Sequence, residues 1–339
     1  MSLGDVWFGL FVVIIAGYLI LDGFDMGVGI LHPWVAKTDE ERRLTLNSIG
    51  PIWDGNEVWI VLGGGVLFAA FAPVYASLFS GFYLAFMLVL LVMILRTVAI
   101  EFRSKRPSPR WRQSWDSVFS IASLGLALLL GVAFGNIIAG VDLEQDGTIN
   151  ESLIDLLNPY ALLVGVTAVS MFALHGALFL NLKTEGELER RVRRAIPPLM
   201  GGFFILTTAT VISTAIWQDE VSDRYLDDIW PVIFPAAALF GFIAVWYLLR
   251  AGHDLFAFAA SGTMIALLLI SGAVGMFPNL LISSINDSYN LTVDNSASAS
   301  NTLTVMLVVA AIGMPLVLVY TAGIYYFFRG KTALGPDSY

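Results

Sequence analysis

The sequence contains no cysteine and little charge. Only 13% of its 339 residues are charged and 57% are hydrophobic, whereas soluble domains carry roughly 25% charged residues. The lack of cysteine excludes disulfides, thiolate nucleophiles and cysteine metal sites. A soluble fold of this size has too little interior to hide so much apolar surface. The composition therefore predicts an integral membrane protein.

Positive charge and histidine are also scarce. The net charge of −9 argues against nucleic-acid binding, which requires a basic face. Of the three histidines, only His175 lies well within an apolar run. A protein with several haems needs axial ligands on facing helices, so we expect no haem in this chain. The first apolar run lacks a basic flank and a small-residue cleavage site, which predicts a retained span.

Apolar runs of about 20 residues recur along the chain and predict nine transmembrane helices. They are 7–31, 52–71, 77–100, 117–139, 160–181, 199–217, 229–249, 255–277 and 303–328. We expect one all-α polytopic membrane domain over 1–339, with helices 1–4 within 7–139, helices 5–8 within 160–277 and helix 9 at 303–328. The nine helices can form two four-helix bundles plus one peripheral helix.

Lysine and arginine lie almost only in alternate loops. The loops after the first, third and fifth runs and the segments after the seventh and ninth are basic, whereas the other loops contain one basic residue, Arg224, and many acids. The positive-inside rule then predicts the N-terminus outside and the C-terminus in the cytoplasm. The Ser- and Asn-rich stretch 279–301 reads as a flexible external loop.

The first span carries two acids where lipid-facing residues are expected. Asp22 and Asp25 are three residues apart and share a helix face. Gly23, Gly27 and Gly29 allow a second helix to approach closely. Charge inside a span is costly and often marks function. Two interpretations stay open: the acids pair structurally with a basic group, or they handle protons.

The second span begins with Asp54, and Glu57 follows one turn later. Asp54 in a first turn also suits the helix dipole, whereas Glu57 is harder to explain in that way. Trp53 and Trp59 are typical of residues at a membrane interface.

The third span contains Arg96, followed by Glu101 and Lys105. Arg96 either extends to the cytoplasmic surface, or it neutralises one of the acids Asp22, Asp25 or Glu57, or an anionic cofactor group across the subunit interface.

Two of these segments carry a family resemblance. Residues 21–29 (LDGFDMGVG) and 47–59 (NSIGPIWDGNEVW) resemble the opening of cytochrome bd oxidase subunit II, and the block at 53–56 is very specific. The match continues through 68–71, 79–83, Arg96, 102–105 and 131–136, and is weaker later, at 156–159 and 275–278. It covers essentially the whole chain.

The resemblance implies a bacterial plasma-membrane complex that oxidises membrane quinol and reduces O2 to water. Two b-type haems and one d-type haem would lie in the partner, subunit I, and none in this chain. Subunit II would resemble subunit I in fold and pair with it pseudo-symmetrically. Some members also bind a structural quinone in subunit II, and some complexes include a small accessory single-helix subunit.

The resemblance also implies residue roles. Asp25 and Asp54 match acids of the family's proton path, to which the residue pattern adds Asp22 and Glu57. Trp59 matches the mouth of its oxygen path. A polar cluster at the subunit interface on the cytoplasmic side matches Arg96, Glu101 and Lys105.

The charge-derived topology agrees with these roles. It puts Asp25 and Asp54 toward the cytoplasm, from which the protons that reduce O2 would come. Glu57 stands where some members carry an uncharged amide.

Two other functions remain open from the residues alone. A proton-coupled secondary transporter or channel would use Asp22, Asp25, Asp54 and Glu57 at its coupling site. A purely structural membrane subunit is the third reading. Haem absorbance that co-purifies with the complex and is missing from this chain alone separates the oxidase from the transporter.

Overall fold

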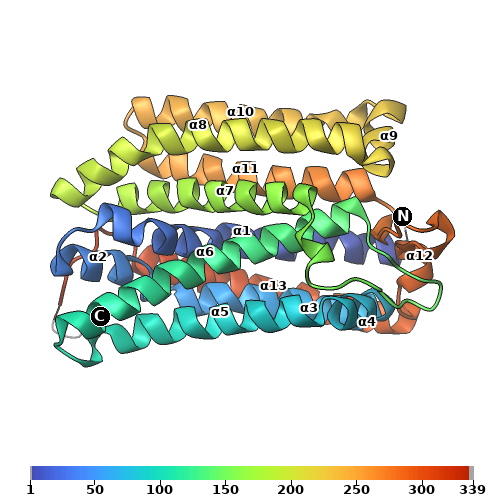
Figure 1. Ribbon diagram of the computed structural model, residues 1–339, viewed down its shortest axis with the longest axis horizontal. Coiled ribbons are helices and arrows are strands. Elements are labelled where there is room, and N and C mark those ends of the chain that lie inside the picture. Colours follow the sequence, from blue (N-terminus) through green and yellow to red (C-terminus); the bar gives the residue numbers. More distant parts are fainter. Residues whose placement is uncertain (1, 336–339) are drawn as a thin grey trace.

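The computed structural model describes residues 2–335, in which helices and one short two-stranded sheet are joined by irregular segments (Figure 1). The helices and strands are α1 (Leu3–Val35), α2 (Asp39–Ile49), α3 (Trp53–Ala70), α4 (Ala72–Gly81), α5 (Tyr83–Phe102), η1 (Arg103–Lys105), α6 (Pro109–Ala139), η2 (Asp155–Leu157), α7 (Pro159–Lys183), α8 (Gly186–Trp217), α9 (Asp219–Asp227), η3 (Trp230–Val232), α10 (Ile233–Arg250), α11 (Asp254–Met276), β1 (Asn279–Leu281), η4 (Asp287–Tyr289), β2 (Leu291–Thr292), α12 (Val293–Ser296) and α13 (Ser300–Phe327).

Within the described residues, 8 helices are long and apolar enough to cross a membrane. They are α1, α5, α6, α7, α8, α10, α11 and α13, and they run roughly side by side in Figure 1. The predicted span 52–71 corresponds to α3, which is not among them. The reason is its polar start, because Asp54, Asn56 and Glu57 lie within its first five residues.

Several predicted boundaries were wrong. The predicted span 77–100 is two helices, α4 and α5, which meet at Phe82. Helix α1 begins at Leu3 because Ser2 and Asp5 form a capping box. Helix α8 begins at Gly186 and not near 199, since its first turns are charged and carry no hydropathy signal. Hydropathy detects the membrane-embedded part of a helix, and several helices here extend beyond it.

Helix α1 is at the centre of the packing. It contacts α3, α6, α7 and α11, and α6 and α7 also pack on each other. Among the other helices, α5 packs on α6, which in turn packs on α1. Helix α7 packs on α8, and α10 packs on α11. Helix α13 touches α1 and α3 and is otherwise largely exposed.

Glycines allow α1 to approach its neighbours, as the sequence predicts. A Cβ on Gly27 would overlap the carbonyl oxygen of Phe172, and one on Gly176 would overlap the backbone of Gly27. The backbones of α1 and α7 are therefore in direct contact. Gly29 likewise meets Ser123 of α6. On α3, a Cβ at Gly63 would meet Ile15 of α1, whereas one at Gly64 or Gly65 would meet nothing within 4 Å.

The stretch 279–301 is not the flexible loop that its composition predicts. Strands β1 and β2 pair antiparallel there, and α12 follows with a capping box between Thr292 and Asn295. The buried Asn290 side chain accepts a hydrogen bond from the backbone of Ser283 over 2.7 Å. Asparagine and serine side chains thus satisfy the backbone of a folded cap over the N-terminal end of α1.

Candidate functional site

Charged side chains from three helices meet inside the helix assembly. Arg96 of α5 donates from Nη2 to Asp22 of α1 over 2.5 Å and also to Glu57 of α3. The side chains of Arg96 and Asp22 are 1% and 0% exposed, and that of Glu57 is 16% exposed. The structure thus brings together three of the residues that the sequence singled out. Arg96 points inward to these acids and does not extend to the surface.

Asp25 lies beside this group and forms no ion pair with any residue that the structure describes. Its Oδ2 accepts a hydrogen bond from the Asn56 amide over 2.7 Å, and the Asn56 carbonyl accepts one from the Tyr325 hydroxyl of α13 over 2.9 Å. The other oxygen of Asp25 is buried without a hydrogen-bond partner among the described residues. A row of three side chains therefore connects α1, α3 and α13.

The charges of this site do not balance. Asp22, Asp25 and Glu57 would carry three negative charges against the single positive charge of Arg96. Uncompensated charge in a low-dielectric interior costs several kcal/mol. Charge balance therefore favours a proton on at least one of these carboxyl groups. Asp25 is the carboxyl group best placed to carry this proton, because Arg96 pairs with Asp22 and Glu57.

Asp54 lies near this site but faces outward. It is exposed at the start of α3 together with Gly55, Val58 and Val61, which form one helix face. Exposure falls along the acids, from Asp54 to the partly buried Glu57 and then to Asp25, which is 1% exposed. The four predicted acids thus extend from the molecular surface into the interior.

The Trp59 side chain points into the protein interior. Its side chain is 6% exposed and packs on Gly17 of α1, where an added Cβ would come within 2.6 Å of the indole ring. The ring therefore fills the contact between α1 and α3.

The three residues predicted as an interface cluster lie in order along α5 and the adjoining η1. Arg96 belongs to the buried site with Asp22 and Glu57. Glu101 is partly buried further along α5, and Lys105 is exposed at the end of η1.

Sequence reasoning missed two members of the site, Asn56 and Tyr325. Asn56 had a detectable signal, since an amide within an apolar span needs a partner. Tyr325 had none, because it lies 269 residues from Asn56 along the chain and tyrosine is common near membrane interfaces.

A second buried polar group lies at the end of the molecule that carries α2. Asp116 of α6 accepts hydrogen bonds from His32, Arg42 and Arg103 over 2.8, 2.9 and 2.5 Å. Arg103 also reaches Asp39 over 2.9 Å. This group joins α1, α2, η1 and α6, and the sequence analysis did not anticipate it. Its signal was an acid at the edge of the predicted span 117–139.

The central histidine is fully occupied by protein partners. His175 donates from Nε2 to the Ile20 carbonyl over 3.0 Å, and its Nδ1 lies 2.7 Å from the Ser261 hydroxyl. Its ring stacks on Phe258. Within residues 2–335, no group of three or more acidic or histidine side chains is arranged to hold a metal ion.

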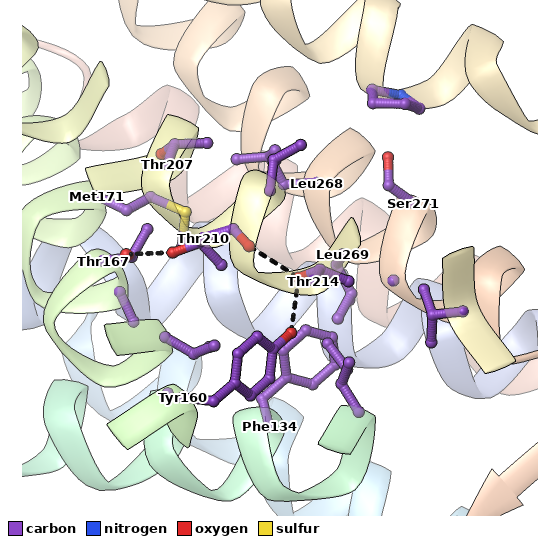
Figure 2. A pocket seen from close by; sticks show the side chains of 18 of the residues that line it. Phe134, Tyr160, Thr167, Met171, Thr207, Thr210, Thr214, Leu268, Leu269 and Ser271 are labelled. Atoms are coloured by element: carbon purple, nitrogen blue, oxygen red, sulfur yellow. Dashed lines mark hydrogen bonds between the residues drawn. The ribbon is translucent and has the colours of Figure 1, made fainter. Parts of the chain in front are cut away.

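An apolar cavity lies between α6, α7, α8 and α11 (Figure 2). Its volume is about 460 Å³. Side-chain hydroxyls lie along one wall of the cavity. Hydrogen bonds join Tyr160 to Thr214 over 2.7 Å and Thr167 to Thr210 over 2.8 Å. Thr207 also lines the cavity, and its buried hydroxyl has no hydrogen-bond partner within residues 2–335. The cavity suits a long apolar ligand with a polar group.

These features define a multi-pass helical membrane protein with a buried acid–arginine site. Residues 3–328 match the family described as cytochrome bd terminal oxidase subunit II. The chain is 35% identical over 332 residues to cytochrome bd ubiquinol oxidase subunit 2 of Bacillus subtilis, covering 98% of this chain and 97% of that protein. It is also 35% identical over 356 residues to cytochrome bd-I ubiquinol oxidase subunit 2 of Escherichia coli, covering 96% and 94%.

A solved bd oxidase structure from Geobacillus thermodenitrificans has the same fold. One of its chains superposes with a TM-score of 0.80 at 15% identity, covering 97% of this chain and 98% of that one. The chain belongs to the cytochrome bd terminal oxidase subunit II family. It is a subunit of a membrane oxidoreductase, and a multi-pass protein of the bacterial plasma membrane.

Proposed function

We propose that this chain serves a terminal oxidase that oxidises membrane quinol and reduces O2 to water, and that it conducts protons toward the site of O2 reduction. The observation that carries this proposal is Asp25, a buried carboxyl group held by Asn56 and without a cationic partner. Family membership favours this function over a secondary transporter or a purely structural subunit.

The acids suggest the direction of proton movement. Protons would enter at the exposed Asp54, pass the partly buried Glu57 and reach Asp25. Arg96 and Asp22 would hold Glu57 in place and set the charge of the site. A carboxyl group in a passage takes up and releases protons, whereas the guanidinium does not. Trp59, packed on Gly17, would border the path of O2.

The proposed orientation has the N-terminus outside and the C-terminus in the cytoplasm. In support, the basic segments of α2, η1 and the start of α8 lie at the same end of the molecule (Figure 1). We propose α3 as a ninth span, because it packs along α1 and also contacts α13. The contacts also support two four-helix groups, α1–α3–α5–α6 and α7–α8–α10–α11, with α13 at the periphery.

The proposed partner is subunit I, which would carry two b-type haems and one d-type haem. His175 supports a haem-free subunit II, because both of its ring nitrogens already have protein partners. The outer face of α3 suits the partner. An exposed Asp54 at membrane depth is costly against lipid, and Gly64 and Gly65 leave room for a close neighbour.

The cavity between α6, α7, α8 and α11 is the proposed site of a structural quinone. Its apolar wall suits an isoprenoid tail, and the Thr207 hydroxyl, which has no partner, would donate to a quinone carbonyl. Extraction of the purified complex with organic solvent, followed by chromatography, tests this proposal. Thr207→Val should reduce the quinone retained per haem, and unchanged retention contradicts it. A small accessory single-helix subunit remains part of the proposed complex.

An absorbance spectrum tests the main proposal. The purified complex should have b- and d-type haem bands and oxidise quinol with O2 as acceptor. This chain purified alone should lack stoichiometric haem. A complex without these bands contradicts the oxidase function, and a full Soret band from the single chain contradicts the haem-free proposal.

A further inference from the structure

A groove lies between two of the most exposed helices, α8 and α10, at the basic end of the molecule. Helix α8 packs chiefly on α7 and helix α10 on α11, so the two meet mainly through side chains. The groove has a volume of about 560 Å³. Apolar residues form its floor, and two arginines, Arg193 and Arg250, stand at one end.

The two walls have regular spacing. Arg193, Pro197 and Gly201 follow one another at intervals of four residues on α8, and Trp246 and Arg250 do the same on α10. Residues at that interval share a helix face, so each wall is basic at the mouth and apolar below. A side chain at Gly201 would meet nothing within 4 Å, which keeps the groove open.

The groove has the length of one membrane leaflet. On α8 it extends from Arg193 to Phe204, which is about 16 Å of helix at 1.5 Å per residue. The hydrocarbon core of a bilayer is about 30 Å thick, so one leaflet is about 15 Å. The arginines therefore lie at headgroup level when the apolar floor lies at acyl-chain level.

The charges at the mouth favour an anion. The Arg250 guanidinium stacks on Trp246, 4.0 Å from the ring centroid. Stacking fixes the plane of the guanidinium and leaves the N–H groups at its edge available to a ligand. Among residues 2–335 no carboxylate lies within 4.0 Å of Arg250. Within the described part of the chain, the single ion pair of Arg193 is a long one, 3.8 Å from Asp254, and its side chain is 46% exposed. Arg193 also donates to the Leu249 carbonyl over 3.2 Å, which ties the two walls together.

We propose that this groove binds an anionic phospholipid of the cytoplasmic leaflet, with its phosphate on Arg193 and Arg250 and an acyl chain along Pro197, Gly201 and Phe204. Basic pockets between transmembrane helices on the cytoplasmic side bind such headgroups. Trp246 suits the same depth, because tryptophan is enriched at the membrane interface. The choice of leaflet rests on the orientation proposed above, whereas the oxidase function does not enter the argument.

The test uses the purified, delipidated complex and native mass spectrometry with phosphatidylglycerol or phosphatidylcholine added in micelles. The complex should retain phosphatidylglycerol preferentially. Each arginine near a membrane surface contributes about fivefold to anionic lipid binding, so Arg193→Gln with Arg250→Gln should weaken retention about 25-fold. Arg329→Gln is the matched control, since Arg329 also stacks on an aromatic ring at a helix end, 3.8 Å from Tyr326, but lines no part of the groove.

A second pair of variants blocks the groove without changing charge. Gly201→Leu fills it, whereas Gly202→Leu places the same side chain in equally open space beside it. Only Gly201→Leu should reduce phosphatidylglycerol retention. Equal retention of both lipids by the wild type, unchanged retention in both groove variants, or a small protein subunit in the groove in place of lipid would overturn the proposal. The oxidase rate of each sample separates this result from any failure of the proposed function.

Discussion

Arg96 donates to Asp22 over 2.5 Å between two helices, and both side chains are almost completely buried. Loss of one partner from a buried ion pair leaves the other uncompensated, at a cost of about 3–5 kcal/mol. Arg96→Gln should therefore reduce the amount of assembled complex and its melting temperature. Asp22→Asn in the same chain should restore part of the loss. Arg110→Gln, at an exposed arginine, is the control. If Arg96→Gln assembled as well as Arg110→Gln, that result would contradict a structural role for the Arg96–Asp22 pair.

Trp59 fills the contact between α1 and α3 against Gly17. Trp59→Ala should lower the melting temperature, since removing a buried large aromatic costs about 3–5 kcal/mol. If the opened space borders the path of O2, apparent O2 affinity should change more than quinol affinity. Trp34→Ala, at an exposed tryptophan, should alter neither. Equal or negligible effects of Trp59→Ala on both affinities would leave Trp59 with a packing role only.

The proposed topology has a direct test. A reporter fused after Lys105 should be cytoplasmic, and one inserted near Asp146 should be external, because basic loops stay in the cytoplasm. Opposite labelling at either site rejects the proposed orientation, and with it the direction of proton entry.

Glu41 joins α2 to α8 through Arg191. Burial raises the pKa of Glu41, but hydrogen bonds from the Lys37 and Thr38 backbone and from Arg191 outweigh this and lower it. A lowered folded-state pKa contributes stability above the unfolded value, about 4.3, and loses it as pH falls through the folded value. Glu41→Gln should therefore lower the melting temperature at pH 7.

The difference between wild type and Glu41→Gln should shrink as the pH falls from about 5 to about 3, since Glu41 is then protonated in both states. Glu40→Gln, on the exposed face of the same helix, serves as the control. A difference that stays constant over this range would show that Glu41 does not act through its charge.

Much of the fold follows from apolar run length and loop charge. The positions of the long helices were predictable because hydrocarbon requires internally bonded helices. Boundaries such as the start of α8 at Gly186 were not, since charged turns beyond the membrane carry no hydropathy signal. The break between α4 and α5 at Phe82 was not predicted for the opposite reason, because apolar residues continue across it.

The candidate site was predictable in part. Asp22, Glu57 and Arg96 were identified because charge is rare within spans, but their pairing depends on how α1, α3 and α5 pack. The contact of Tyr325 with Asn56 depends on where α13 lies, which no local pattern encodes. The outward direction of Asp54 depends on the rotation of α3 about its axis.

The central claim is that Asp25 carries protons. Asn is nearly the same size and can still accept the hydrogen bond from Asn56, but it cannot exchange a proton. Turnover should fall at least about tenfold in Asp25→Asn, an increase of about 1.4 kcal/mol in the barrier. Asp54→Asn should act in the same direction, because it removes the proposed entry point.

The most direct measurement is the quinol oxidase rate per haem, with haem content determined on the same Asp25→Asn sample. The proposal predicts an assembled complex with normal haem content and a rate lower by an order of magnitude or more. A normal rate per haem in the complex that assembles would contradict it, whether or not less complex assembles, and would leave Asp25 with a structural role.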